Sequence, residues 1–523
     1  MRRLRARIGA GAALHSAASS ASKSIGFGLL LLYGHALTPA DFGVLVLLYL
    51  TTFLLDGIAI QGLTARILRQ HALAAGEDDP SRRRVVTTAF VHTVASGAVL
   101  FGLLALAAGP ASLLFFREPR WSTLLQLMCI AGFLRAVQNV PRQMLRARGR
   151  SGWLDGLRLG DAVAAAVLNI LLVVGAGLGL TGVVYGEVLR EGVATLLLVF
   201  TLRRDLCHAP SMVALRRLLR DGWPRLRREL PNLVLAANDR YFLAFSTSVS
   251  LIGTYGFGLR LAQALGDFVV QPLLGLVPGL HAPDGAAEGR REVFGRFLTY
   301  FVALAGLTAL AIAVFAPSLL RIVCQPDYEG TAWILPLLLM ALAIGGVQKL
   351  LLVCLRLEGR PAPPVQRATF AAAVLSLTGN ALLVPKHGAL GAAFTAVLAQ
   401  SLLCAMVLVA ARRSQLLRFE PGRLTKVAAA LFSSFYIAGF VMPDDLVGQI
   451  AAAWAMVLLY PALLGVFGFY TVAEVERLRD LFNHRIGKAA SKPADRKDFP
   501  FPAVTEAADQ AELVGAGADR QRS

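Results

Sequence analysis

Asn238, Asp239 and Arg240 lie in the middle of a mostly apolar stretch of the chain, ELPNLVLAANDRYFLAFS, at positions 229–246. In a helix, Asn232 and Asp239 share one face, whereas Arg240 follows Asp239 directly and points about 100° away. The acid and the guanidinium are therefore expected to pair poorly with each other, and each needs a partner on another helix, in a water-filled cavity or on a ligand. Inside a membrane, such groups bind protons, cations or anions. A structural ion pair to a neighbouring helix explains them equally well.

A second polar face lies near the N-terminus, within positions 10–35. Ser16, Ser20 and Lys23 follow the spacing i, i+4, i+7 and share one side of a helix. No acid is within helical reach of Lys23, and a charge at mid-membrane costs about 2.5–3.5 kcal/mol on insertion scales. We therefore expect these side chains to line a polar cavity suited to an anionic, hydroxylated ligand. The alternative is a face of small residues with a lysine whose ammonium group reaches the membrane surface.

Two further charges, Asp56 and Arg260, lack a partner of opposite sign at helical spacing. A carboxylate removed from water binds a proton more readily, so Asp56 and Asp239 are candidates for binding a coupling proton or cation. A salt bridge from Asp56 to Lys23 on the neighbouring segment is equally compatible with the sequence. Arg260 is the deepest such cation in the second half of the chain, and we expect it to line the cavity there.

The other charged residues of the apolar segments have simpler explanations. Arg135 falls near a predicted membrane surface, where its side chain can reach water. Arg158 with Asp161, and Glu187 with Arg190, are spaced i, i+3 and can pair within one helix. The five cysteines form no CxxC motif. We predict no disulfide framework, no metal site, no cofactor and no catalytic residue.

The composition indicates what kind of protein must position these side chains. Of the 523 residues, 56% are hydrophobic and 16% are charged, compared with about 25% charged residues in typical soluble proteins. Apolar runs of about 18 residues or more recur along the chain, which predicts an all-α polytopic membrane protein. The net charge of +19 fits basic cytoplasmic loops better than a nucleic-acid partner, because no nucleic-acid motif accompanies it.

We predict fourteen spans, in two lobes of six followed by an extra pair. The predicted spans are 10–35, 41–65, 85–115, 121–141, 152–177, 181–202, 229–248, 251–280, 294–322, 331–355, 366–385, 388–411, 424–441 and 447–471. Basic residues then concentrate in the loops of one side, which places both termini in the cytoplasm. The predicted units are an N-terminal lobe, a basic amphipathic linker on the cytoplasmic leaflet, a C-terminal lobe, the extra pair and a polar tail expected to be disordered. Their ranges are 1–202, 203–228, 229–411, 424–471 and 472–523.

The two halves resemble each other in sequence. Gly43 aligns with Gly256 at an offset of 213, Gly179 aligns with Gly388 at 209, and an AAAVL motif recurs after 207 residues. Because six spans is an even number, such a duplication gives two lobes of the same orientation, related by a pseudo-twofold axis along the membrane normal. Lobes of this kind suit a transporter that rocks about a central cavity.

Three segments resemble polysaccharide flippases of the multidrug/oligosaccharidyl-lipid/polysaccharide exporter superfamily. They are LTPADFGVLVLLYLTTFLLDGIAIQGL at 37–63, NDRYFLAFSTSVSLIGTYGFGLRLAQAL at 238–265 and HGALGAAFTAVLAQSL at 387–402, within a resemblance that covers about residues 10–471. The resemblance implies alternating access between two six-helix lobes. It also implies that the chain moves undecaprenyl-diphosphate-linked oligosaccharide to the outer leaflet of the bacterial cytoplasmic (inner) membrane. The cargo would serve surface polysaccharide synthesis, as lipopolysaccharide O-antigen, capsule or exopolysaccharide.

Two other transport functions stay open from the sequence. One is a cation-coupled multidrug or metabolite antiporter of the same superfamily, and the other is a flippase for a peptidoglycan lipid precursor. The face that carries Ser16, Ser20 and Lys23 favours an anionic, hydroxylated cargo over a cationic drug. An enzyme is not expected, because the predicted outer loops are short and their one acidic cluster, MPDD at 442–445, lies in the extra pair. The expected partners are the lipid-linked glycan, membrane lipids and polysaccharide polymerase or assembly proteins.

Overall fold

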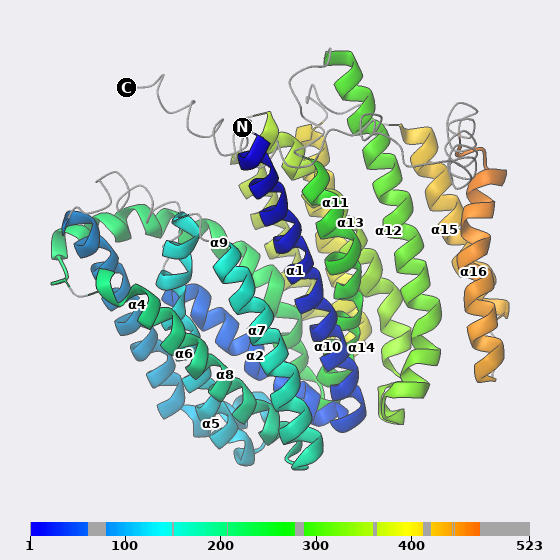
Figure 1. The fold of residues 1–523 in the computed structure, drawn as a ribbon. Coiled ribbons are helices and arrows are strands. Elements are labelled where there is room, and N and C mark those ends of the chain that lie inside the picture. The colour runs from blue at the N-terminus through cyan, green and yellow to red at the C-terminus, as the bar shows by residue number, and fades with distance from the viewer. Residues whose placement is uncertain are drawn as a thin grey trace.

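The chain folds as a set of long helices, and no strand occurs in the residues that the computed structural model describes. Figure 1 shows the earlier helices, from blue to teal, grouped on one side and the later helices, from green to orange, on the other. We call α1–α8 the N-lobe and α9–α14 the C-lobe. The described residues are 2–60, 80–148, 151–206, 208–277, 287–358, 363–411, 420–441, 443 and 445–470.

The described residues of the N-lobe form seven α-helices, and one of them ends in a π-helical turn (Ile170–Gly175). The helices are α1 (Arg2–Ala36), α2 (Pro39–Ala59), α4 (Pro80–Leu106), α5 (Ala108–Phe116), α6 (Ser122–Ala147), α7 (Ser151–Asn169) and α8 (Gly179–Leu202). Within this lobe α6 packs on both α4 and α8, and α7 packs on α1. The lobe is therefore held together by contacts between helices that are not all neighbours in sequence.

The C-lobe begins with one helix that joins two predicted units. Helix α9 runs without a break from Met212 to Ser246, through Pro224 and Pro231, so the predicted linker and the next predicted span form one element. The lobe continues with α10 (Val249–Leu265), a π-helical turn (Gly266–Val270), α11 (Gln271–Leu276), α12 (Ala287–Val323), α13 (Thr331–Leu357) and α14 (Pro363–Ala411). The predicted disordered tail, 472–523, lies outside the described residues.

Two more helices, α15 (Pro421–Val441) and α16 (Leu446–Val466), pack against α12 at the edge of the C-lobe (Figure 1). The hydroxyl of Tyr460 donates to the carbonyl of Ala303 at 3.1 Å. The guanidinium of Arg423 donates to the carbonyl of Phe469 at 2.8 Å. The Tyr460 contact and apolar packing thus attach the extra pair to α12 of the C-lobe, whereas the Arg423 contact joins α15 to the residues after α16.

Nine of the described helical segments are long and apolar enough to cross a membrane, by length and composition. One of them, Val365–Ala411, is 47 residues long and is interrupted at Gly388, so it covers two of the predicted spans. The other four predicted spans correspond to α1, α8, α9 and α10, which are not among the nine. These four helices carry Lys23, Arg190, Asp239 and Arg260, and α10, with 17 residues, is also the shortest of the four.

The ends of α2 and α10 meet where the two lobes are in closest contact. Each helix starts with a hydroxyl cap: Thr38 accepts from the Asp41 amide at 3.2 Å, and Ser248 accepts from the Leu251 amide at 3.3 Å. The helices then cross at two glycines. A Cβ atom at Gly43 would collide with the Val249 carbonyl, and one at Gly253 would collide with the Pro39 carbonyl. Only residues without a side chain allow this approach.

The contacts of these helices correct one part of the predicted repeat. Thr38 and Ser248 occupy equivalent cap positions 210 residues apart, and so do Gly43 and Gly253. Gly256 instead faces Val46, so the predicted match of Gly43 to Gly256 is out of register by three residues. The error arose because three glycines lie in the short segment GTYGFG and sequence alone does not distinguish them.

The second glycine match is supported by backbone conformation. Gly179 has a φ angle of 53° and Gly388 has a φ angle of 54°, both in the left-handed region that glycine adopts without strain. Gly179 starts α8 after the π-helical end of α7, and Gly388 interrupts α14. Both halves of the chain therefore place a glycine with a positive φ angle at this point of the repeat.

The same end of the N-lobe is also joined to the connection between α12 and α13. The Gln325 amide donates to the carbonyl of Gly34 at 3.0 Å, and the buried hydroxyl of Tyr328 donates to the carbonyl of Leu37 at 3.2 Å. Burial raises the pKa of Tyr328 above its ordinary value, so this hydroxyl stays a donor over the physiological pH range. Together with Gly43 and Gly253, these contacts close the two lobes against each other at this end.

We expect Gly253→Ala to loosen this closed end. The added methyl group would meet backbone atoms on the opposite helix, which cannot rotate away as a flexible side chain can. Overpacking of this kind costs about 1–3 kcal/mol, so the melting temperature of the purified protein should fall. Gly102→Ala in α4 is the matched control, because nothing lies within 4 Å of its added Cβ. Equal melting temperatures for the two variants would contradict the close approach.

Candidate functional site

Lys23 lies between the two lobes and has a partner that the sequence did not suggest. Its ammonium group donates to the backbone carbonyl of Asp267 at 3.1 Å and lies 3.6 Å from the carboxylate of the same residue. Asp267 is in the π-helical turn after α10, so this ion pair joins the N-lobe to the C-lobe. Ser20 is exposed on the same face of α1, whereas the side chain of Ser16 lies outside the described residues.

Asp239 and Arg240 form an ion pair, and the prediction that they pair poorly is wrong. The Arg240 Nε atom lies 3.2 Å from Asp239 Oδ1, and the Tyr255 hydroxyl donates to Asp239 Oδ2 at 2.7 Å. The guanidinium also donates to the carbonyl of Ala236, one turn earlier. The Cα–Cβ bonds of adjacent residues do diverge, but the arginine side chain is long enough to fold back along the helix.

Asn232 does not join this pair. It is exposed, and its amide donates to the Glu229 carboxylate at 2.9 Å. The seven residues between Asn232 and Asp239 correspond to about 10 Å along the helix axis. A shared helix face therefore does not bring the two side chains into one site.

Arg260 is exposed, and its contacts with neighbouring side chains are weak. The Arg260 guanidinium lies 3.5 Å from Gln263 Oε1, its one hydrogen bond to a described side chain. It is within electrostatic range of Arg240 and of Asp267, the partner of Lys23. The structure thus brings together the three cations Lys23, Arg240 and Arg260, from α1, α9 and α10.

We call Lys23, Arg240, Arg260, Asp239 and Asp267 the seam site, because they lie where the two lobes face each other. Three positive and two negative charges leave an excess of one positive charge. Lys23 and Arg240 already contact the two carboxylates, so Arg260 is the cation that the acids compensate least. The seam site therefore favours an anionic group over a cationic one.

Asp56 lies away from the seam site and belongs to the interior of the N-lobe. Its carboxylate accepts a hydrogen bond from the Asn139 amide at 2.6 Å. Arg135, Arg142 and Glu191 are within electrostatic range. The alternative that Asp56 pairs with Lys23 is wrong, because Lys23 is held by Asp267 on the other side of the seam.

The N-lobe contains a larger set of ion pairs that the sequence prediction dismissed. We call Arg135, Asp161, Glu187, Arg190 and Glu191 the N-lobe ionic cluster. The Arg135 guanidinium contacts Glu187 at 2.5 Å and Glu191 at 2.9 Å. The Arg190 guanidinium contacts Glu187 at 2.5 Å and also pairs with Asp161. The side chains of Glu187 and Glu191 are each only 5% exposed.

Neutral donors complete the shell of the N-lobe ionic cluster. The Tyr49 hydroxyl donates to Glu187 at 3.0 Å, and the Gln138 amide donates to Glu191 at 2.7 Å. Each buried carboxylate thus has a guanidinium and at least one neutral donor, which is the condition under which buried charges are tolerated. The cluster joins α2, α6, α7 and α8 into one unit.

Two earlier interpretations are corrected by the N-lobe ionic cluster. Arg135 does not extend toward a membrane surface but is held by two glutamates. Asp161 pairs with Arg190 rather than with Arg158, which instead lies 3.7 Å from Asp155. The predicted pair of Glu187 and Arg190 is present, yet it is one contact in a network that crosses three helices.

The C-lobe has an uncharged network in its interior. The Asn238 amide donates to the Ser376 hydroxyl at 3.0 Å, and the Asn380 amide donates to the Asn238 carbonyl oxygen at 2.6 Å. These contacts join α9 to α14. The contact of α9 with α14 is therefore made by neutral hydrogen bonds, whereas α6, α7 and α8 of the N-lobe are joined by ion pairs.

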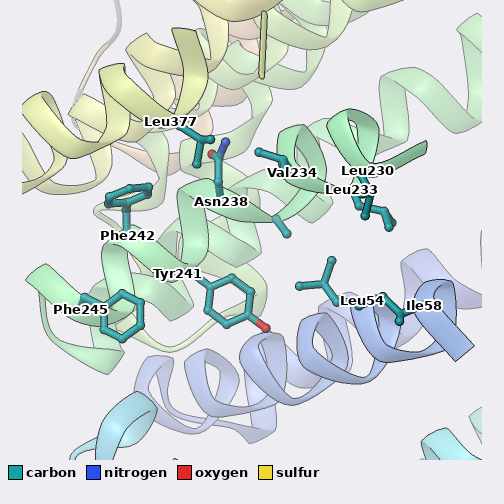
Figure 2. Close-up of a pocket in the computed structure, with 11 residues that line it drawn as sticks. Leu54, Ile58, Leu230, Leu233, Val234, Asn238, Tyr241, Phe242, Phe245 and Leu377 are labelled. Carbon is teal, nitrogen blue, oxygen red and sulfur yellow. The ribbon is translucent and has the colours of Figure 1, made fainter. Parts of the chain in front are cut away.

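An apolar groove of about 390 Å³ lies beside the seam, between α2 and α9 (Figure 2). Figure 2 shows Tyr241 reaching from α9 toward α2, where its hydroxyl lies 2.9 Å from the hydroxyl of Thr51. This hydrogen bond connects the lobes next to the groove. The lining residues are Leu54, Ile58, Leu230, Leu233, Val234, Ala237, Asn238, Tyr241, Phe242, Phe245 and Leu377.

The family of the chain follows from comparison with known proteins. A model of the polysaccharide biosynthesis protein family matches residues 8–280, so the chain belongs to this family. No curated protein sequence gives a significant match.

Solved structures agree with the fold. The structure of the lipid II flippase MurJ in an inward closed conformation superposes with a TM-score of 0.69 at 12% identity, over 87% of this chain and 98% of that one. An inward-facing multidrug resistance MATE transporter of the MOP superfamily superposes with a TM-score of 0.57 at 16% identity, over 80% of this chain and 95% of that one. The protein is a multi-pass membrane protein with the all-α fold of these transporters.

Proposed function

We propose that the protein is a flippase that moves undecaprenyl-diphosphate-linked oligosaccharide from the cytoplasmic to the outer leaflet of the bacterial cytoplasmic membrane. The observation that carries this proposal is the excess positive charge of the seam site, in a chain of the polysaccharide biosynthesis protein family. A diphosphate and a glycan cannot enter hydrocarbon without replacement of their hydration. Lys23, Arg240 and Arg260 provide cationic donors at the place where the lobes separate.

Alternating access would use the closed end of the lobes as the outer gate. With the N-terminus in the cytoplasm, α1 ends at the outer surface, where Gly43 and Gly253 hold α2 against α10. The seam site would then bind the headgroup from the cytoplasmic side, while the lipid tail stays in the bilayer. Opening would require the contacts of Gln325 and Tyr328 with the N-lobe to break. The C-terminus would also be cytoplasmic, and polysaccharide polymerase or assembly proteins would receive the product.

The proposal is tested in a strain that lacks the gene. Lipid-linked glycans are extracted, and their leaflet is determined with an enzyme or label that cannot cross the membrane. We expect complete repeat units to accumulate on the cytoplasmic leaflet while surface polysaccharide disappears. Unchanged glycan pools with an altered sensitivity to toxic cations would instead indicate the multidrug antiporter. Accumulation of a peptidoglycan precursor would indicate the other flippase.

In this proposal, Asp56 is the residue that binds the coupling proton or cation. Of the two candidate acids, Asp239 is already held by Arg240 and Tyr255, whereas Asp56 has an amide as its hydrogen-bond partner among the described side chains. An acid without a contacting cation is the better proton carrier in a membrane interior.

We therefore expect Asp56→Asn to remove the response of transport to a pH gradient while leaving the fold intact. The amide keeps the size of the side chain and can still bond to Asn139. Flipping of labelled lipid-linked glycan is measured in proteoliposomes with and without an imposed gradient. Asp41→Asn, at the start of the same helix, is the control and should keep the response. A full response in Asp56→Asn would refute the assignment.

A further inference from the structure

A second cavity lies between α6, α7 and α8, beside the N-lobe ionic cluster. Its volume is about 120 Å³, and a water molecule needs about 10–15 Å³ of such space. The cavity therefore has room for a small polyatomic ion. Its lining residues are Arg142, Arg146, Leu154, Leu157, Arg158, Asp161 and Ala194.

Three guanidiniums from two helices meet at this cavity. Arg142 and Arg146 are four residues apart near the end of α6 and so share one face of that helix. Arg158 enters from the first half of α7. Arg158 and Arg146 are within electrostatic range of each other, so the arrangement places like charges together. Such a group of cations is stable only if something nearby compensates it.

The protein supplies only part of that compensation. Among the described residues, neither Arg142 nor Arg146 makes a hydrogen bond or a salt bridge. Glu191, Asp161 and Asp56 act on Arg142 from a distance. Arg146 has Asp155 within range, but Arg158 shares that acid at 3.7 Å. Two donor-rich side chains thus face the cavity without a bound acceptor.

Asp161, the acidic residue that lines the cavity, also indicates which kind of ligand can bind there. Asp161 pairs with Arg190 in the N-lobe ionic cluster, so its charge is already compensated. Its other oxygen, Oδ1, is buried and has no hydrogen-bond donor among the described residues. A ligand that suits this site carries several acceptor oxygens for the guanidiniums and one hydroxyl for Asp161. Inorganic phosphate that keeps one proton has this pattern, and so has a lipid phosphodiester whose headgroup carries a hydroxyl.

We propose that this cavity binds a phosphate group at the cytoplasmic surface of the membrane. The helix ends that form it, the end of α6 and the start of α7, lie on the side that carries the basic loops. The phosphate comes from an anionic lipid headgroup or from phosphate free in solution. This binding site is separate from the seam site and does not depend on the proposed flippase function.

The test uses the full-length protein in nanodiscs and two probes. The first is inorganic phosphate added to discs of phosphatidylcholine, with the melting temperature as the readout. The second is phosphatidylglycerol mixed into the discs, with native mass spectrometry of retained lipid as the readout. Arg146→Gln is the main variant, because this exposed side chain has no contact to lose. Arg142→Gln is the second variant, and Arg217→Gln on α9, also exposed, is the control of equal charge.

We expect Arg146→Gln to weaken binding at least about tenfold, the change for loss of one charge-assisted hydrogen bond. Arg217→Gln should bind as the unchanged protein does. Binding of inorganic phosphate that Arg146→Gln weakens supports the site with a free anion as its ligand. Retention of phosphatidylglycerol alone, weakened by the same variant, supports it with a lipid headgroup. No binding of either probe, or equal loss in Arg146→Gln and Arg217→Gln, overturns the proposal.

Discussion

Replacing Arg260 with glutamate is expected to abolish glycan export while leaving the amount of protein in the membrane unchanged. Arg260 is exposed and contacts only Gln263 among the described side chains, so the change breaks no buried ion pair. It converts the excess positive charge of the seam site into an excess negative one. Placing like charges together costs several kcal/mol, so a diphosphate would no longer bind. Surface polysaccharide is the readout, and immunoblotting of membranes gives the protein level.

The matched control for Arg260→Glu is Lys386→Glu, which reverses an exposed lysine of α14 outside the seam site. Export should be normal in this control. Normal export from Arg260→Glu as well would show that Arg260 does not bind the headgroup. It would also show that export does not need the excess positive charge of the seam site.

Lys23 needs a different experiment, because Lys23→Glu would set a new acid against Asp267. The exchange variant Lys23→Asp with Asp267→Lys keeps an ion pair between the lobes and reverses its direction. If the ion pair between Lys23 and Asp267 only connects the lobes, the single variant Lys23→Asp should lose export and the exchange variant should regain it. We expect no restoration, because the cation would move from α1 to the turn after α10 and away from the headgroup.

The helices of this chain could be predicted from sequence because a membrane leaves few alternatives. Backbone groups in hydrocarbon must bond within their own segment, so a long apolar run becomes a helix. The predicted span 331–355 is α13 (Thr331–Leu357), and 181–202 lies within α8 (Gly179–Leu202). Spacing also selected Lys23 and Arg260, since a cation without a local acid is expensive in that setting.

The partners of those charges could not be predicted, because they lie on other helices. Arg135 has no acid at helical spacing, yet it contacts Glu187 and Glu191, more than fifty positions away. The signal that could have been used is the density of charge in α8, where Glu187, Arg190 and Glu191 fall within five residues of an apolar helix. A single i, i+3 pair accounts for two of these groups and leaves Glu191 unexplained.

Asp267 was missed for a related reason. It sits at a π-helical turn, and such turns shift the face on which the following residues lie. Even at regular helical spacing, Asp267 shares a face with Arg260, seven positions earlier. Nothing in the sequence shows, however, that this face meets Lys23 of α1 across the seam.

Arg190→Gln is expected to have the largest effect on stability. The change leaves Asp161, Glu187 and Glu191 with Arg135 as the one contacting guanidinium. Removing one partner of a buried ion pair typically costs about 3–5 kcal/mol. We expect little of this variant to accumulate in the membrane, and the purified fraction should melt at a lower temperature. A melting temperature equal to that of the unchanged protein would contradict a structural role for the cluster.

The double variant Arg190→Gln with Glu187→Gln separates stability from transport. It removes one charge of each sign, so the balance of the N-lobe ionic cluster is kept and most of the lost stability should return. Both glutamates are buried, and a substrate that enters between the lobes would not reach them. We therefore expect the double variant to export glycan normally. A double variant that melts normally but does not export would show that the cluster takes part in transport, and coupling would then have to be assigned to the cluster as a whole rather than to Asp56 alone.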